Sequence, residues 1–518
     1  MMDRKWWTLL VVSAGTFMLL LDVTIVVVAL PAIQRELHAT FSDVQWVVDA
    51  YALTLAALLL TSGVLADRHG RRRLFAIGLG LFTAGSLTCG LAQSPLMLII
   101  SRSGQGIGGA ILFATSLALL GHSFRGRDRG VAFAIWGAVT AVAVSVGPIV
   151  GGAITTGLSW RWIFLVNVPI GVAALVVTLW RVEESRAPRP GRLDWPGFAT
   201  LTGGLFGLVY GLIRASETSW GDAGVVIALG LGGALLLLFI GVELRAAHPM
   251  FDLSLFRIPT FTGGLITAFT MNASLFAMFL YLVIYLQDIL GYSALGSGLR
   301  LVASTGGMLI TSAISGRLSE HVPVRWLIGP GLALTGIGLL LMAGLSGTSS
   351  WTHLLPGLIV AGLGSGLVNP PLASTAIGVV APERAGMASG VNSTFRQIGF
   401  AVAIAALGSI FASSFQNSLT RGLSSTPALA AHAGQIATLV RQGNVAQALS
   451  LAPAPLRGQL AALVRSNFAS GINELLIVSG IVALIGAVCS GLFIRSRDFL
   501  PRQALPDTLD AQPVPELA

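Results

Sequence analysis

Residues 63–73 read GVLADRHGRRR and lie between two long apolar segments, at 44–66 and 74–92. Each flanking segment is long enough to cross the hydrocarbon core of a bilayer as a helix, which takes about 20 residues. The stretch therefore forms a short basic loop between two membrane-spanning helices. Because short arginine-rich loops stay on the cytoplasmic side of a membrane, this loop also indicates the orientation of the chain.

Apolar segments of the same kind recur on both sides of this loop over almost the whole chain. Of the 518 residues, 54% are hydrophobic and only 10% are charged, which excludes a soluble domain. We therefore predict an all-α integral membrane protein. Fourteen spans are expected, at 7–30, 44–66, 74–92, 96–120, 131–157, 162–180, 197–214, 223–244, 260–286, 295–316, 326–346, 352–379, 386–412 and 471–494.

The Lys and Arg residues are concentrated in alternate connections between these spans. With the N-terminus in the cytoplasm, most of the 31 Lys and Arg fall in cytoplasmic segments, and the short outer connections hold only Arg35, Arg161 and Arg214. We therefore predict that both termini are cytoplasmic, and this topology explains the basic composition without nucleic acid as a partner. The ratio of 30 Arg to one Lys indicates a high-GC bacterial source, and hence the bacterial inner (plasma) membrane.

A weak internal repeat suggests how the spans are grouped. Residues 63–68 resemble residues 316–321, which follow the tenth span, and transporters are often built from repeated halves. Chance similarity of two turns is the alternative. The repeat predicts an N-terminal six-helix bundle at 1–182, an inserted helix pair at 183–258, a C-terminal six-helix bundle at 259–498 and a cytoplasmic tail at 499–518. A long outer loop, 413–470, lacks Asp and Glu and is expected to hold short surface helices.

Charged residues inside the spans are the first functional candidates. A charge in the membrane interior costs roughly 2.5 to 3.5 kcal/mol on insertion scales. Asp22 lies roughly 12 Å and Arg102 roughly 9 Å below the outer ends of their spans at the helical rise, so an ion pair between them is expected. Burial favours the neutral form of Asp22 and a nearby Arg favours the anion, so a conformational change could load or release a proton. The alternative is a structural pair that only fixes helix register.

Two further charges are weaker candidates. Asp49 lies about five residues inside its span, where it can serve protons or a substrate cation or simply reach interfacial water. Arg396 lies near the middle of the span at 386–412 and should face a cavity or another helix. Cys89 and Cys489 both fall in apolar segments, so they are interpreted as packing residues and no metal site is expected.

Several stretches resemble one known family, the drug:proton antiporters with fourteen helices of the major facilitator superfamily. The loop at 63–73 looks like the superfamily signature between helices 2 and 3. The resemblance implies a gate in which Asp67, at the cytoplasmic end of its span, meets the start of the span at 382–386 and is favoured there by the helix dipole. The gate residues implied are Gly63, Asp67, Arg68, Gly70 and Arg71.

Other motifs carry the same resemblance. Residues 21–31 are similar to the first-helix motif of the group, although Val27 stands where Asn is usual. Residues 102–109 resemble the fourth-helix motif implicated in proton transfer, which adds Gln105 one turn from Arg102. Residues 386–399 resemble the thirteenth-helix pattern that contains Arg396. The fifth-helix motif of antiporters is matched at Gly147, Pro148, Gly151 and Gly152, with Ala143 in place of an expected Gly.

The resemblance implies the major facilitator fold and a proton-coupled antiporter that exports small lipophilic drugs or antibiotics, with Asp22 as proton carrier. Protons would be the coupling ion and no other cofactor is expected, since no nucleotide-binding loop occurs. The expected partners are a small lipophilic or cationic substrate and membrane lipid, and the chain is expected to be a monomer and not an enzyme. A transporter of an endogenous metabolite, lipid or nutrient is the alternative. Candidate residues of the substrate cavity are Thr24, Asn272, Phe276, Asn369, Asn392 and Arg396.

Overall fold

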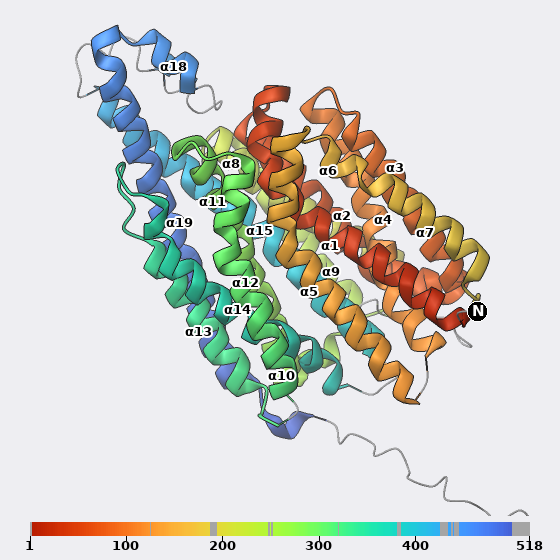
Figure 1. Cartoon of the computed structure of the whole chain (residues 1–518). Helices are drawn as coiled ribbons and strands as arrows, with labels where there is room; N and C mark the ends of the chain where they lie inside the picture. The colour runs from red at the N-terminus through yellow and green to blue at the C-terminus, as the bar shows by residue number, and fades with distance from the viewer. Residues whose placement is uncertain are drawn as a thin grey trace, which may run out of the picture.

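A computed structural model describes most of the chain. The described residues are 3–124, 126–186, 194–246, 249, 252–319, 321–380, 385–424, 434–436, 439 and 445–499. Figure 1 shows them as a bundle of long helices. We call the side of the molecule at which the first helix begins the amino side and the opposite side the far side.

The N-terminal half contains six spans, the last of them made of two consecutive helices. The first span begins at Arg4 and ends at a left-handed residue, His38, while the second is opened by a capping box between Thr40 and Asp43. The helices are α1 (Arg4–Leu37), α2 (Phe41–His69), α3 (Arg71–Gly90), α4 (Pro95–Ser123), α5 (Gly126–Gly157), α6 (Trp162–Leu165) and α7 (Asn167–Arg181).

The inserted pair and the C-terminal half follow in the same up-and-down order. The pair consists of α8 (Trp195–Glu217) and α9 (Ala223–Glu243). The C-terminal half consists of η1 (Leu253–Arg257), α10 (Pro259–Met271), η2 (Asn272–Phe276), α11 (Ala277–Ile284), η3 (Tyr285–Ile289), α12 (Ala294–Leu318), α13 (Arg325–Met342), η4 (Trp351–His353), α14 (Leu355–Gly378), α15 (Ala385–Ser424), α18 (Val445–Leu451), η6 (Ala454–Leu456), α19 (Arg457–Phe493) and η7 (Ser496–Asp498).

Thirteen helical segments in the described chain are long and apolar enough to cross a membrane, and α12 supplies the fourteenth predicted span. Helix α12 is less apolar because it carries hydroxyl side chains that it uses within the bundle. Thr311, Ser312 and Ser315 donate hydrogen bonds to main-chain carbonyls of α14 at 2.9, 3.3 and 2.8 Å. Such interhelical hydrogen bonds stabilise helix contacts inside a membrane.

The structure corrects two details of the predicted spans. The span at 260–286 is not one regular helix, because π-helical segments at η2 and η3 interrupt it; π-segments of this kind are frequent at functional sites. The helices that flank the predicted outer loop at 413–470 are longer than the predicted spans, since α15 continues to Ser424 and α19 begins at Arg457. The short surface helix expected there is present as α18.

Two helix pairs join the halves. Helix α2 packs along α15, and α5 packs along α12 (Figure 1). Helix α8 packs against both α2 and α15, so the inserted pair covers the seam between them. On that seam the Trp46 ring lies 5.9 Å from the Phe206 ring and 6.3 Å from the Tyr210 ring.

Several contacts between the halves lie toward the far side. The Gln45 amide donates to the carbonyl of Ile404 at 3.0 Å, and the Gln287 amide donates to the carbonyl of Val28 at 2.8 Å. Near the far ends of α5 and α12, the Leu295 amide donates to the Thr156 hydroxyl at 3.0 Å. The halves are therefore held together at the far side of the membrane-spanning region.

Candidate functional site: a buried carboxylate and guanidinium cluster

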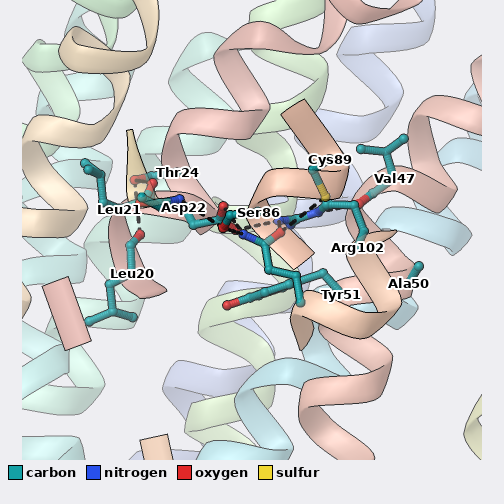
Figure 2. A network of polar contacts seen from close by, with 12 residues as sticks. Leu20, Leu21, Asp22, Thr24, Val47, Ala50, Tyr51, Ser86, Cys89 and Arg102 are labelled. Carbon is teal, nitrogen blue, oxygen red and sulfur yellow. Dashed lines mark hydrogen bonds and ion pairs between the residues drawn. The ribbon is translucent and has the colours of Figure 1, made fainter. Parts of the chain in front are cut away.

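Asp22 and Arg102 form an ion pair inside the N-terminal half. Arg102 Nη1 lies 2.5 Å from Asp22 Oδ2, and each residue is 1% exposed. Asp22 comes from α1 and Arg102 from α4, so the pair joins two spans that are far apart in the sequence (Figure 2). The structure thus contains the ion pair that the depth of the two residues predicts.

Gln105 connects the pair to a third helix. Its amide nitrogen donates to Asp22 Oδ1 and to the Ser86 hydroxyl of α3, both at 2.8 Å. Its carbonyl oxygen accepts a hydrogen bond from Arg102 Nη1 at 2.7 Å. Both oxygens of the Asp22 carboxylate are therefore hydrogen-bonded, which is what a buried charge requires.

Arg102 is also held from the side of α2. Its Nε donates to the carbonyl of Val47 at 3.1 Å, and its guanidinium carbon lies 4.2 Å from the centre of the Tyr51 ring. The cation–π contact and the carbonyl enclose the cation away from water. Figure 2 shows Tyr51 and Val47 beside Arg102.

Small residues allow the three helices to come close enough for this cluster. A Cβ at Gly106 would lie 2.7 Å from the carbonyl oxygen of Tyr51, and a Cβ at Gly85 would lie 2.8 Å from the main chain at Gln105. Close helix approach through glycine is a common packing mode in membranes. The glycines around Gln105 thus position its side chain between α1 and α3.

Three polar partners of the cluster escaped the sequence analysis. Ser86 accepts the Gln105 amide, and the Asn167 amide lies 3.5 Å from the same hydroxyl. Cys89, interpreted as a packing residue, is fully buried but also lies 3.7 Å from the Gln105 carbonyl oxygen as a weak donor. Ser86 and Cys89 are three residues apart in an apolar span and so share one helix face, which is the signal that could have identified them.

The arrangement has a chemical consequence. The carboxylate and the guanidinium neutralise each other, and a proton added to Asp22 would leave Arg102 as a buried cation without a counter-ion. Removing one partner of a buried pair costs about 3 to 5 kcal/mol. A proton on Asp22 is therefore compatible with the cluster only if Arg102 moves or water enters.

Asp49 lies elsewhere, close to the contact between α2 and the C-terminal half. It is fully buried, and neither of its carboxylate oxygens has a hydrogen-bond partner among the described residues. It is one turn from Gln45, which bonds to α15. The structure therefore does not bring Asp49 into the cluster of Asp22 and Arg102.

The predicted gate loop has its own ion pair. Arg71 donates to Asp67 Oδ1 from Nε at 2.9 Å and from Nη2 at 2.8 Å, while Gly70 takes a positive φ of 113° between α2 and α3. A positive φ favours glycine at that position. The predicted contact of Asp67 is with the start of the span at 382–386, of which 382–384 lie outside the described residues, so this contact stays a prediction.

The glycines of α5 contact both halves. A Cβ at Gly147 would lie 1.9 Å from the Thr24 hydroxyl of α1, and one at Gly152 would lie 2.6 Å from the carbonyl of Ala294 in α12. The Pro148 carbonyl lies against α12 as well, at Gly298. Gly151 packs on α1 at Ile25. The motif thus provides close packing on α1 and across the junction of the halves.

The predicted cavity residues come from α1, α14, α15 and the π-helical segment η2. Arg396 Nη1 donates to Asn369 Oδ1 at 3.1 Å, which joins α15 to α14 just before the Pro370–Pro371 pair. Asn272 donates to the carbonyl of Ala268 in its own helix. Of the remaining three, Thr24 bonds within α1, Phe276 packs on Phe279, and the buried Asn392 lies one turn before Arg396 on α15.

In the described chain, thirteen helical segments long and apolar enough to cross a membrane, with a hydrogen-bonded ion pair buried among them, indicate a multi-pass membrane protein. The chain belongs to the Major Facilitator Superfamily, whose family model matches residues 12–404. This membership confirms the predicted fold and confirms that the chain is a transporter and not an enzyme.

Relatives and solved structures agree with this assignment. The chain is 36% identical over 406 residues to the multidrug resistance protein Stp of Mycobacterium tuberculosis strain H37Rv, covering 78% of this chain and 75% of that one. It is 33% identical over 519 residues to the tetracenomycin C resistance and export protein of Streptomyces glaucescens, covering 99% of this chain and 95% of that one. A bacterial homologue of the human lysosomal transporter Spinster, crystallised in an inward-facing and occupied conformation, matches the fold with a TM-score of 0.65 at 16% identity, covering 96% of this chain and 99% of that one.

Proposed function

We propose that this protein is a proton-coupled antiporter that exports small lipophilic drugs or antibiotics from the cytoplasm or the inner leaflet. The single observation that carries the coupling is the fully hydrogen-bonded ion pair of Asp22 and Arg102 in the N-terminal half. The names of the relatives, which refer to multidrug resistance and to tetracenomycin C export, support drugs as the substrate class.

In the proposed cycle, Asp22 carries the proton. In the described conformation the Asp22 carboxylate accepts hydrogen bonds from Arg102 and Gln105. Proton entry from the outside requires the pair to separate, so it is tied to a rearrangement of α1 against α4. One charge crossing about 100 mV gains roughly 2.3 kcal/mol, which is near fortyfold in concentration and sufficient for uphill export.

We propose alternating access about the two contacts between the halves, α2 with α15 and α5 with α12. In the described conformation, Gln45, Gln287 and Thr156 take part in contacts between the halves toward the far side. We take the amino side as cytoplasmic, in the inner membrane of a bacterium, with both termini inside. Substrate then enters from the amino side, and rocking of the halves about these seams carries it outward.

We further place the substrate near the bond between Arg396 and Asn369 in the C-terminal half. The guanidinium has five N–H donors, and Asn369 is the partner that the structure records for it within the described residues. The Arg396 side chain is half-buried, although Arg396 lies near the middle of its span. The unused donors fit the carbonyl or phenol oxygens of an otherwise lipophilic molecule.

Dye uptake into energised inside-out vesicles tests the proposal. Vesicles that contain the protein should accumulate a lipophilic dye when a proton gradient is present, and a protonophore should abolish the accumulation. Vesicles without the protein provide the baseline. Accumulation that survives the protonophore, or dye movement in the opposite direction, would contradict proton-driven export.

A further inference from the structure

A groove opens on the amino side between the start of α3 and the end of α7. It has a volume of about 560 Å³, and its charged rim includes Arg72, Arg73 and Arg186, with Ile77, Leu175 and Leu179 among the apolar residues of its wall. Neither the transport cycle nor the gate accounts for this groove. We propose that it binds one anionic phospholipid of the inner leaflet, with the phosphate at the rim and an acyl chain along the apolar wall.

The charge at the rim is not balanced by the protein. Glu184 is the acidic residue of the groove. Its carboxylate accepts hydrogen bonds from the backbone amides of Arg72 at 3.0 Å and Arg73 at 3.2 Å. Glu184 Oε2 lies 4.0 Å from Arg72 Nε, so the negative charge of Glu184 offsets the positive charge of Arg72. The exposed side chains of Arg73 and Arg186 have no acidic partner within the described part of the chain. Two positive charges therefore remain for a ligand.

The apolar wall lies deeper in the membrane than the rim. Ile77 follows Arg73 by one helical turn, or roughly 6 Å at the helical rise. Ile77 is 46% exposed, and Leu179 on the facing helix is 54% exposed. From the membrane surface inward, the groove presents arginine side chains first and exposed apolar side chains second. This is the order of the phosphate and the acyl chain in a phospholipid. Basic pockets between membrane helices on the cytoplasmic side bind anionic lipid headgroups for this reason.

The site is connected to the loop that precedes α3. The Arg71 amide donates to the carbonyl of Ser185 at 2.9 Å, next to Glu184, and the Arg71 side chain pairs with Asp67. A bound lipid would therefore hold the start of α3 against the segment after α7. The inference does not depend on the identity of the exported substrate.

Lipid binding to the purified full-length protein tests the site. Native mass spectrometry would compare phosphatidylglycerol and phosphatidylcholine with identical acyl chains, for the native protein and for the double variant Arg73→Gln/Arg186→Gln. Each basic side chain near a membrane surface contributes a factor of about five, so the variant should bind phosphatidylglycerol roughly 25-fold more weakly. Binding of phosphatidylcholine should not change.

Two controls distinguish the groove from the general basic character of the amino side. Arg317→Gln removes a charge from the same side in the C-terminal half and should leave binding unchanged. The variant Arg73→Lys/Arg186→Lys keeps the charge and should retain binding, which also guards against misfolding of the glutamine variant. Equal phosphatidylglycerol binding by the native protein and the glutamine variant would overturn the proposal. So would an equal loss in Arg317→Gln, or equally tight binding of glycerol phosphate without acyl chains.

Discussion

The Asp22 carboxylate receives one hydrogen bond from a cation and one from an amide, and both come from α4. Because the two donors are one turn apart on a single helix, a small movement of α4 against α1 would remove both together. Residues at this site should therefore be coupled in their effect on stability as well as on transport.

Arg102→Gln is expected to destabilise the protein by about 3 to 5 kcal/mol, because it leaves the Asp22 carboxylate buried without its cation. The double variant Asp22→Asn/Arg102→Gln removes both charges and should recover part of that loss. Chemical denaturation in detergent measures all three free energies of unfolding. A double variant less stable than Arg102→Gln would show that the pair is not energetically coupled.

Asp49→Asn should behave differently. An ionised carboxylate buried without a partner is costly, so the neutral acid is the form that fits this conformation. An amide of the same shape should then change the free energy of unfolding by less than about 1 kcal/mol. The same denaturation experiment applies, with Asp22→Asn as the contrast. A large loss of stability in Asp49→Asn would mean that the carboxylate is ionised and bound.

Part of the buried cluster could be predicted from the sequence. Equal depth in two spans was enough to predict the pair of Asp22 and Arg102, since charges in a membrane are rare and need partners. Ser86 and Tyr51 were not predicted, because a single hydroxyl or aromatic residue in a span is common and its partner depends on helix rotation. The separation of Asp49 from the cluster likewise follows from rotation of α2, which depth cannot reveal.

At the scale of helices, α5 lies between α1 and α12, and its glycines allow both contacts. Gly152→Val should abolish transport while the protein still inserts, because a side chain there would meet the main chain of α12 at Ala294 and separate the far-side ends. Gly137→Val is the matched control on the same helix, since a Cβ at Gly137 meets nothing within 4 Å. Drug export and membrane abundance are the measurements. Normal export by Gly152→Val would show that this contact is not needed.

Helix α9 begins with a charged cap. Asp222 accepts the amides of Gly224 and Val225, and its hydrogen bond with Arg214 lowers the pKa of the Asp222 carboxyl below its usual value. A lowered pKa stabilises the folded state above the unfolded value of about 3.9 and loses that effect as the pH falls through the folded value. Asp222→Asn should therefore be less stable than the native protein at pH 7, and the gap should close as the pH falls below about 4. Thermal unfolding measured across this pH range tests the prediction. A stability difference between Asp222→Asn and the native protein that does not depend on pH would contradict the ion pair.

Helix existence was easier to predict than helix extent. Hydropathy predicted fourteen spans, and thirteen of them correspond to described helices long and apolar enough to cross a membrane, because about 20 apolar residues have few other uses. It missed the extensions of α15 and α19, since the Ala, Leu and Gln residues there favour helix without being apolar enough to span. It also missed the π-segments, which arise from local packing rather than from composition.

At the scale of the whole molecule, the two halves meet along α2 with α15 and along α5 with α12, and α8 covers the first seam. The exposed residues Leu237 and Leu238 of α9 fit an outer, lipid-facing position for that helix. The inserted helices α8 and α9 therefore lie at the periphery of the molecule. The buried ion pair of Asp22 and Arg102 lies in the N-terminal half.

Proton coupling through Asp22 is tested most directly by two activities of one reconstituted protein: uphill accumulation of a labelled drug under an imposed proton gradient, and exchange of labelled for unlabelled drug without a gradient. The native protein should perform both, with accumulation up to about fortyfold for one proton at 100 mV. Asp22→Asn should keep exchange and lose accumulation. If Asp22→Asn still accumulates drug against its gradient, Asp22 is not the proton carrier.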